Sequence, residues 1–123
     1  MSYGLAKVRF LTFIETEIFT KRLLKMVDDE TYAGLQAELI RDPTKGKVIQ
    51  GTGGLRKVRM AARGKGKRGG ARIIYYFVPL ADTIYMIFVY DKSEAEDLTS
   101  GQKKTLKALA EAMTESYRRK GKS

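Results

Sequence analysis

The 123-residue sequence contains no cysteine and no histidine. The absence of cysteine excludes disulfides, a thiolate nucleophile and thiolate metal ligands. The absence of histidine removes the commonest general base, a common zinc ligand and the base that serine and cysteine nucleophiles normally need. We therefore expect no metal site and no cofactor, and any catalysis has to come from lysine, arginine, tyrosine or carboxylate side chains.

Long apolar runs are also missing. Residues 1–10 contain no apolar stretch of the length found in a signal peptide. The richest stretch, residues 84–90, is far shorter than the about 20 residues of a membrane span. We therefore expect a cytoplasmic protein without membrane contact.

Proline is scarce, with two residues in the chain, and there is no long polar tract of the kind that indicates disorder. Hydrophobic residues make up 43% of the sequence, and a chain of this length has enough of them for one core but not for two. We expect a single domain over residues 1–117, followed by a frayed basic tail over residues 118–123.

The net charge of +10 is concentrated in one segment. Residues 41–72 hold eleven of the 24 basic residues and one of the 14 acidic residues, so that the other 91 residues carry 13 of each. A focused positive field attracts polyanions, and nucleic acid is the default partner. A merely solvated basic loop explains the segment less well, because dispersed charge would give solubility without this repulsion.

Local patterns predict a strand, two helices, three or four strands and a final helix. Apolar spacing and turn residues place these elements at 7–13, 15–27, 28–41, 48–50, 55–61, 71–78, 84–90 and 99–117. Two boxes of the S/T-x-x-E/Q type, Thr12 with Glu15 and Thr99 with Gln102, are expected to cap the first and last helices. Consecutive strands between grouped helices favour an α+β fold, in which a helical hairpin covers a largely antiparallel sheet.

The connection over residues 63–70 is rich in glycine, lysine and arginine. It is not a nucleotide-binding P-loop, because no Ser or Thr follows a Gly-Lys pair and no helix is predicted after it. We expect a flexible loop that contacts phosphates, since glycines let basic side chains reach outward. The residues expected to contact RNA in and around this loop are Arg56, Arg63, Lys65, Lys67 and Arg68.

Three cations are expected to meet on one surface of the sheet. Period-two geometry puts Lys57 and Arg59 on the same face of their strand, and Arg72 opens the partner strand beside them. Like charges on neighbouring strands repel, and a bound polyanion removes this cost. Among the nearby tyrosines, Tyr90 is the one expected to face these cations, where its ring would stack on single-stranded bases.

Three blocks of sequence resemble the HigB branch of the RelE toxin superfamily. They are Gly51-Thr-Gly-Gly-Leu-Arg-Lys57, Gly69-Gly-Ala-Arg-Ile-Ile-Tyr-Tyr76 and Tyr90-Asp-Lys-Ser-Glu-Ala-Glu-Asp-Leu-Thr99. The resemblance covers nearly the whole chain. It implies a microbial RNase fold, cleavage of mRNA in the ribosomal A site, and a cognate helix-turn-helix antitoxin.

The resemblance also implies roles for individual residues. Lys57, Arg59 and Arg72 match the basic catalytic residues of the family, and Lys92 matches one member of a Lys-Arg pair after the last strand. The tyrosine that normally follows this pair is missing here. The general base is therefore unassigned, and Tyr90 is its candidate substitute.

Two other functions fit the same basic surface. One is a noncatalytic module that binds RNA or the ribosome, which would spread its cations along a groove instead of clustering them. The other is the gyrase-poisoning branch of the same fold, which retention of the basic strand residues argues against. In the favoured interpretation the RNA 2′-OH attacks the adjacent phosphate without a metal ion, Arg59 and Arg72 stabilise the transition state, and Lys57 or Lys92 transfers protons.

Overall fold

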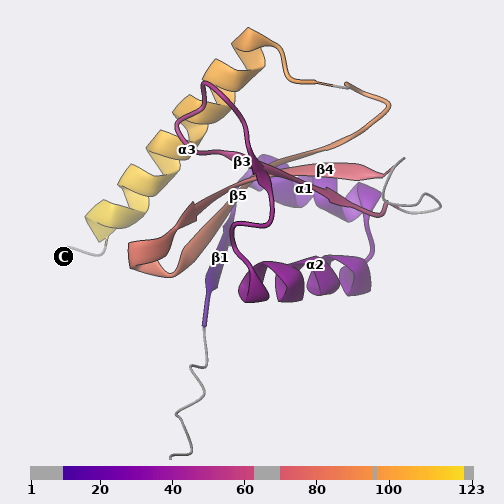
Figure 1. The fold of residues 1–123 in the computed structure, drawn as a ribbon, viewed down its shortest axis with the longest axis horizontal. Helices are drawn as coiled ribbons and strands as arrows, with labels where there is room; N and C mark the ends of the chain where they lie inside the picture. Colours follow the sequence, from indigo (N-terminus) through magenta and orange to yellow (C-terminus); the bar gives the residue numbers. More distant parts are fainter. Residues whose placement is uncertain (1–9, 63–69, 96, 121–123) are drawn as a thin grey trace, which may run out of the picture.

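The computed structural model describes residues 10–62, 70–95 and 97–120. These residues form three α-helices, five strands and one 3₁₀ turn in the order β-α-α-β-β-β-η-β-α (Figure 1). The elements are β1 (Thr12–Glu15), α1 (Glu17–Met26), α2 (Asp29–Arg41), β2 (Lys47–Val48), β3 (Arg56–Met60), β4 (Ala71–Val78), η1 (Pro79–Ala81), β5 (Thr83–Asp91) and α3 (Ser100–Lys120).

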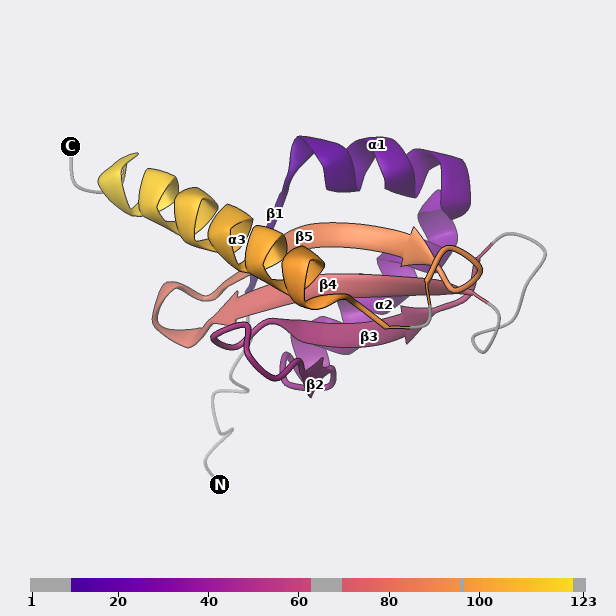
Figure 2. The same ribbon diagram turned by 90° about the horizontal axis from the view of Figure 1, so that it is seen from above.

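The five strands form one sheet in the order β1-β5-β4-β3-β2. Only the β1–β5 pair is parallel, so the predicted α+β fold with a largely antiparallel sheet is confirmed. Helices cover both faces, as the view from above shows (Figure 2). α1 and α2 pack on one face through Phe19, Leu23 and Leu39, and α3 packs on the other through Leu106 and Ala110.

The N-terminal elements begin later than the sequence predicts. The strand predicted at 7–13 is β1, and of the predicted range residues 7–9 lie outside the described part of the chain. The Thr12–Glu15 box does not cap α1, because both residues pair with β5. The cap is Thr16, whose hydroxyl accepts a hydrogen bond from the Phe19 N–H. Pairing with a strand 71 residues away therefore overrides a local capping pattern.

α1 also completes the β5 edge where β1 ends. The Thr16 N–H donates to the Met86 carbonyl at 3.0 Å, and the Thr16 hydroxyl donates to the Ile87 carbonyl at 2.8 Å. Six residues further along the chain, Arg22 Nε donates to the Val89 carbonyl at 2.6 Å. Buried backbone acceptors need such partners, so α1 is fixed along this edge.

α3 begins as predicted and ends later than predicted. The Thr99 hydroxyl accepts from the Gln102 N–H while the Gln102 side chain accepts from the Thr99 N–H, which confirms the second capping box. The helix continues through Arg118 and Arg119, which pair with Glu115, so it extends beyond residue 117, where it was predicted to end. No helix in the described part of the chain is long and apolar enough to cross a membrane.

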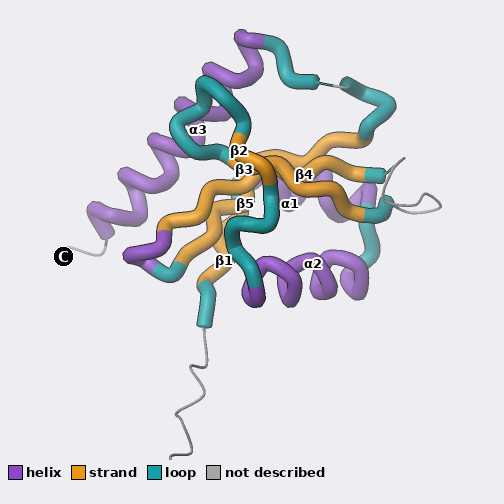
Figure 3. Tube along the Cα trace, viewed as in Figure 1, coloured by secondary structure: helices purple, strands orange, loops and turns teal. Residues whose placement is uncertain are grey.

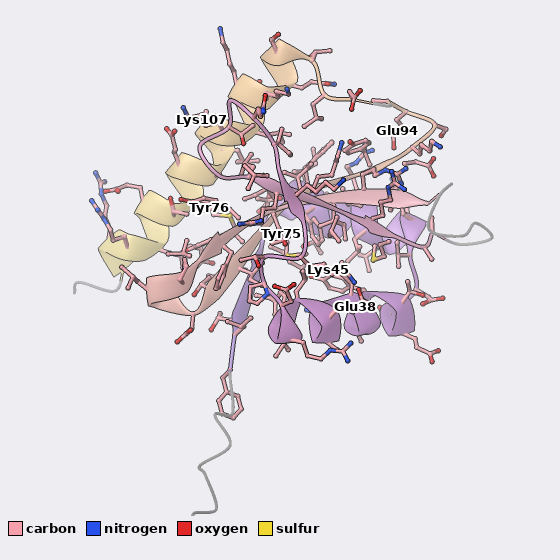
Figure 4. The ribbon with its side chains drawn as sticks, viewed as in Figure 1. Glu38, Lys45, Tyr75, Tyr76, Glu94 and Lys107 are labelled. Atoms are coloured by element: carbon pink, nitrogen blue, oxygen red, sulfur yellow. The ribbon has the colours of Figure 1, made fainter. Side chains whose placement is uncertain are left out.

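The turn between α2 and β2 is held by Tyr75 of β4 (Figure 4). Its fully buried hydroxyl donates to the Pro43 carbonyl and accepts from the Gly46 N–H, both at 2.8 Å. Burial raises the pKa of this phenol, so it remains protonated and can donate. A Cβ at Gly46 would lie 2.8 Å from the Tyr75 ring, which is why only glycine fits there.

Tyr75→Phe is expected to lower the free energy of unfolding by about 1–3 kcal/mol, because it leaves a buried N–H and a buried carbonyl without their partner. Urea denaturation followed by circular dichroism measures the loss. Tyr76→Phe is the matched control, since this half-buried neighbour on the other face of β4 should cost much less. Equal losses in the two variants would show that Tyr75 does not hold the turn.

Candidate active site

Three strands place two arginines and a tyrosine in one row across the sheet. Arg59 of β3 is directly opposite Arg72 of β4, and Arg72 is directly opposite Tyr90 of β5. Side chains at such positions start about 5 Å apart. The sequence prediction that Arg72 lies beside the cations of β3 is therefore confirmed for the strand geometry.

The members of this row differ sharply in exposure. Arg59 is exposed, whereas Arg72 retains only 6% of its accessible surface. A buried guanidinium is fixed by its surroundings, and an exposed one can reach toward a ligand. The row thus combines one preorganised cation with one adjustable cation.

Tyr90 closes the row inside the protein. Its ring is 2% exposed and lies against Phe88, with ring centroids 6.2 Å apart. Burial raises the pKa of its phenol, and the charge of Asp97 adds to this increase while that of Arg72 opposes it. A protonated phenol cannot serve as a general base, and a buried ring cannot stack on RNA bases. In this structure Tyr90 is the buried cross-strand neighbour of Arg72.

The Tyr90 hydroxyl is buried and has no hydrogen-bond partner within the described residues. An unmade bond of this kind costs about 1–3 kcal/mol, and such orphan groups are often found at functional sites. Tyr90 therefore carries a cost that no hydrogen bond among the described residues offsets.

Lys57 lies two residues before Arg59 on β3, opposite Ile74 of β4 and Lys47 of β2. Its ammonium group is 3.8 Å from Asp97 Oδ1, in the loop between β5 and α3. The Asp97 side chain is 91% exposed, so this pair contributes little to stability. Sequence reasoning missed Asp97, since nothing local connects an acid at position 97 with a lysine at position 57.

Lys92 begins the loop that leads from β5 to α3 (Figure 3). Its side chain is exposed, and its N–H donates to the Gly70 carbonyl at 3.1 Å. This bond places Lys92 at the end of the sheet where β4 begins, one residue before Arg72. All four predicted catalytic residues, Lys57, Arg59, Arg72 and Lys92, thus lie toward one end of the β3–β4–β5 sheet.

Arg22 fixes the start of this loop from α1. Its guanidinium contacts both carboxylate oxygens of Glu94 at 2.5 and 2.6 Å, and it lies 4.9 Å from the Phe88 ring centroid. Glu94 also accepts from the Asp91 N–H at 3.0 Å. This backbone bond and the Arg22 charge hold the pKa of Glu94 below its usual 4.5. Sequence reasoning did not identify this clamp.

Other predicted RNA-binding residues are not brought into the row. Arg56 lies on the opposite face of β3, where its guanidinium donates to the Thr44 and Gly46 carbonyls at 3.2 and 2.7 Å. It supports the same turn as Tyr75. Arg63, Lys65, Lys67 and Arg68 lie outside the described residues.

The arrangement is suited to a ligand that gains negative charge. Guanidinium groups bind phosphate oxygens in a bidentate fashion, and donors fixed in advance stabilise charge that develops in a transition state. Lys57 and Lys92 add cations near the row. The chemistry offered is electrostatic stabilisation of a phosphate.

Two comparisons with known proteins bear on the family and the fold of this chain. A model of the family described as the RelE toxin of the RelE/RelB toxin–antitoxin system matches residues 16–120. The solved structure of the Escherichia coli toxin RelE in the free state, a variant with two arginines replaced by alanine, is similar with a TM-score of 0.52 and 16% sequence identity. This match covers 70% of the present chain and 87% of the E. coli chain, and it concerns the fold.

Glu94→Gln is expected to destabilise the protein at neutral pH and to leave it unchanged in acid. Because folding lowers the pKa of Glu94, its contribution is complete above about pH 4.5 and is lost as the pH falls through the folded-state pKa. For a half-exposed pair we expect a loss of about 0.5–1 kcal/mol.

Thermal unfolding of the wild type and Glu94→Gln across pH measures this effect. Glu111→Gln, exposed on α3, is the control and should show no such dependence. A difference between wild type and Glu94→Gln that is the same at all pH values would contradict the clamp.

Proposed function

Because the chain belongs to the RelE toxin family of toxin–antitoxin systems, we propose that it is a ribosome-dependent endoribonuclease that cleaves mRNA in the A site. The observation that carries this proposal is the Arg59–Arg72 pair, in which two cations oppose each other directly across neighbouring strands. The register brings both guanidinium groups to adjacent positions on one face of the sheet, where both can contact the same phosphate.

In the proposed reaction the 2′-OH of one nucleotide attacks the phosphate that joins it to the next. The new O–P bond closes a 2′,3′-cyclic phosphate and the bond to the 5′-oxygen breaks. The 2′-OH loses one proton, and the leaving 5′-oxygen gains one to become a 5′-OH. Arg72 holds the phosphate in a fixed position, and Arg59 adds its charge as negative charge accumulates. Lys57 or Lys92 transfers the protons.

The proposed dependence on the ribosome is supported by the lack of an evident general base in the site. The chain has no histidine, and the buried, protonated Tyr90 cannot accept the 2′-OH proton. In-line alignment of the 2′-OH with the leaving oxygen must then supply much of the rate, and effective molarities of about 10⁵ M and above show how large that contribution can be. Ribosome-bound mRNA would provide this alignment.

The proposal also covers the branch of the family to which the chain belongs and the partners with which it acts. The Gly51–Lys57, Gly69–Tyr76 and Tyr90–Thr99 blocks support placement in the HigB branch. We propose a cytoplasmic protein whose partners are a cognate helix-turn-helix antitoxin, the ribosome and mRNA. Phosphate contacts from Arg63, Lys65, Lys67 and Arg68 would add to RNA affinity, because each neutralised phosphate releases counterions.

Arg59→Ala is expected to reduce mRNA cleavage by about 10²–10³-fold while ribosome affinity falls only a few-fold, because the lost charge acts mainly on the transition state. Primer extension on programmed ribosomes measures cleavage, and co-sedimentation measures affinity. Arg72→Ala should also abolish cleavage, and Arg72→Lys tests the buried position without leaving a cavity.

Arg41→Ala is the matched control, since Arg41 is an exposed arginine at the end of α2. It should keep wild-type cleavage. A noncatalytic binding module would behave differently, with each arginine variant losing a similar, modest share of ribosome binding. Wild-type cleavage by both Arg59→Ala and Arg72→Lys would refute the site.

Expression of the chain alone is expected to arrest growth by stopping translation. Incorporation of radiolabelled amino acids after induction should fall before incorporation of labelled thymidine does. Arg59→Ala is the control and should leave both rates unchanged. Blocked thymidine incorporation with normal translation would instead support the gyrase-poisoning function.

A further inference from the structure

A hollow in the protein surface lies beside the Arg59–Arg72–Tyr90 row. It has a volume of about 410 Å³, within the range of about 300–1,000 Å³ typical of small-molecule sites. Its walls come from β2, β3, the loop before α3, and α3 itself. The lining residues that concern us are Lys47, Lys57, Lys103, Asp97, Ile49 and Leu98.

The hollow lies close enough to the Arg59–Arg72–Tyr90 row for one RNA strand to contact both. Lys57 lines it, and Lys57 precedes Arg59 by two residues on the same face of β3, a separation of about 7 Å. A nucleotide whose phosphate lies between Arg59 and Arg72 would therefore bring a neighbouring base to the hollow. The hollow is a base subsite by its place in the fold.

The hollow is lined by apolar, positively charged and negatively charged side chains, a combination that can distinguish one base from another. Ile49 and Leu98 supply an apolar surface for a flat ring, and both are half-buried. Three lysines supply hydrogen-bond donors, and Asp97 supplies the single carboxylate among the described lining residues. The carboxylate lies on the solvent-exposed side of the hollow, where its Oδ1 is 3.8 Å from Lys57 Nζ.

We propose that this hollow binds guanine and that Asp97 determines this specificity, an inference that rests on the proposed cleavage of RNA. Guanine is the base that offers two adjacent donors, N1–H and the N2 amino group, to the two oxygens of one carboxylate. Its opposite edge offers the N7 and O6 acceptors that lysine recognises. Adenine, cytosine and uracil each present at most one donor group on the edge that a carboxylate would contact.

Asp97 is better placed for recognition than for proton transfer. Its ion pair is with Lys57, and neither Arg59 nor Arg72 lines the hollow. A general base has to lie within hydrogen-bond distance of the attacking 2′-OH, which is beside the scissile phosphate. Asp97 therefore reads the base while the arginines hold the phosphate.

Binding of 3′-mononucleotides to the full-length chain, without the ribosome, tests the subsite independently of cleavage. Isothermal titration should give guanosine 3′-monophosphate an affinity about ten-fold above those of the adenosine, cytidine and uridine analogues. Ribose 5-phosphate reports the contribution of sugar and phosphate alone. Equal affinities for all four nucleotides would overturn the proposal and leave the proposed cleavage to be judged separately.

Asp97→Asn sharpens the test because an amide pairs well with adenine. In this variant the guanosine nucleotide should bind about ten-fold more weakly, and the adenosine nucleotide should become the preferred ligand. Asp82→Asn, an exposed aspartate at the other end of β5, is the matched control and should keep the wild-type order. Retained guanine preference in Asp97→Asn would overturn the proposal.

Mapping of cleavage sites on ribosomes extends the test to RNA. Wild-type cuts should fall next to guanines, and Asp97→Asn should redistribute them toward adenines without abolishing cleavage. If Asp97→Asn stopped cleavage at every site while its order of nucleotide affinities stayed wild-type, Asp97 would be the general base and the specificity role would be wrong.

Discussion

The direct opposition of Arg59 and Arg72 across β3 and β4 is the constraint on which the account of this protein depends. Two positive charges thereby lie on adjacent strands, Arg72 buried and Arg59 exposed. The β4–β5 pairing that positions Arg72 also places the buried Tyr90 directly opposite it, and the Tyr90 hydroxyl has no hydrogen-bond partner among the described residues. The two guanidinium groups are therefore positioned to bind one phosphate.

The rest of the fold keeps this row in place. Tyr75 and Arg56 hold the turn after α2 against β3 and β4 from one face. Beyond the end of β1, Arg22 of α1 donates a hydrogen bond to β5. The same residue forms a salt bridge with Glu94 near the start of the loop that contains Lys92 and Asp97. Residues from α1, β3 and the loop before α3 thereby meet around one end of the sheet.

Local patterns were sufficient where contacts are local. β4 spans the predicted 71–78, α2 is capped by Asp28 as its acidic start indicated, and the Thr99 box operates as expected. The alternation of side chains along a strand correctly predicted that Lys57 and Arg59 lie on the same face of β3.

Long-range contacts account for what local patterns could not show. The start of α1 depends on pairing with β5, and the burial of Tyr90 depends on how α3 and the loop before it cover the sheet. The exclusion of Arg56 from the row follows from the same period-two rule and could have been predicted. The approach of Asp97 to Lys57 joins positions 40 residues apart, and no local signal reports it.

The most direct test of the central claim uses a ribosome-bound mRNA with one 2′-deoxynucleotide immediately before the cleaved bond. The account predicts no cleavage at that bond in the presence of EDTA, normal cleavage of the unmodified mRNA, and a 2′,3′-cyclic phosphate on its product. Cleavage of the deoxy-substituted mRNA at the same bond and rate would contradict attack by the 2′-OH, and with it the role given to the paired arginines.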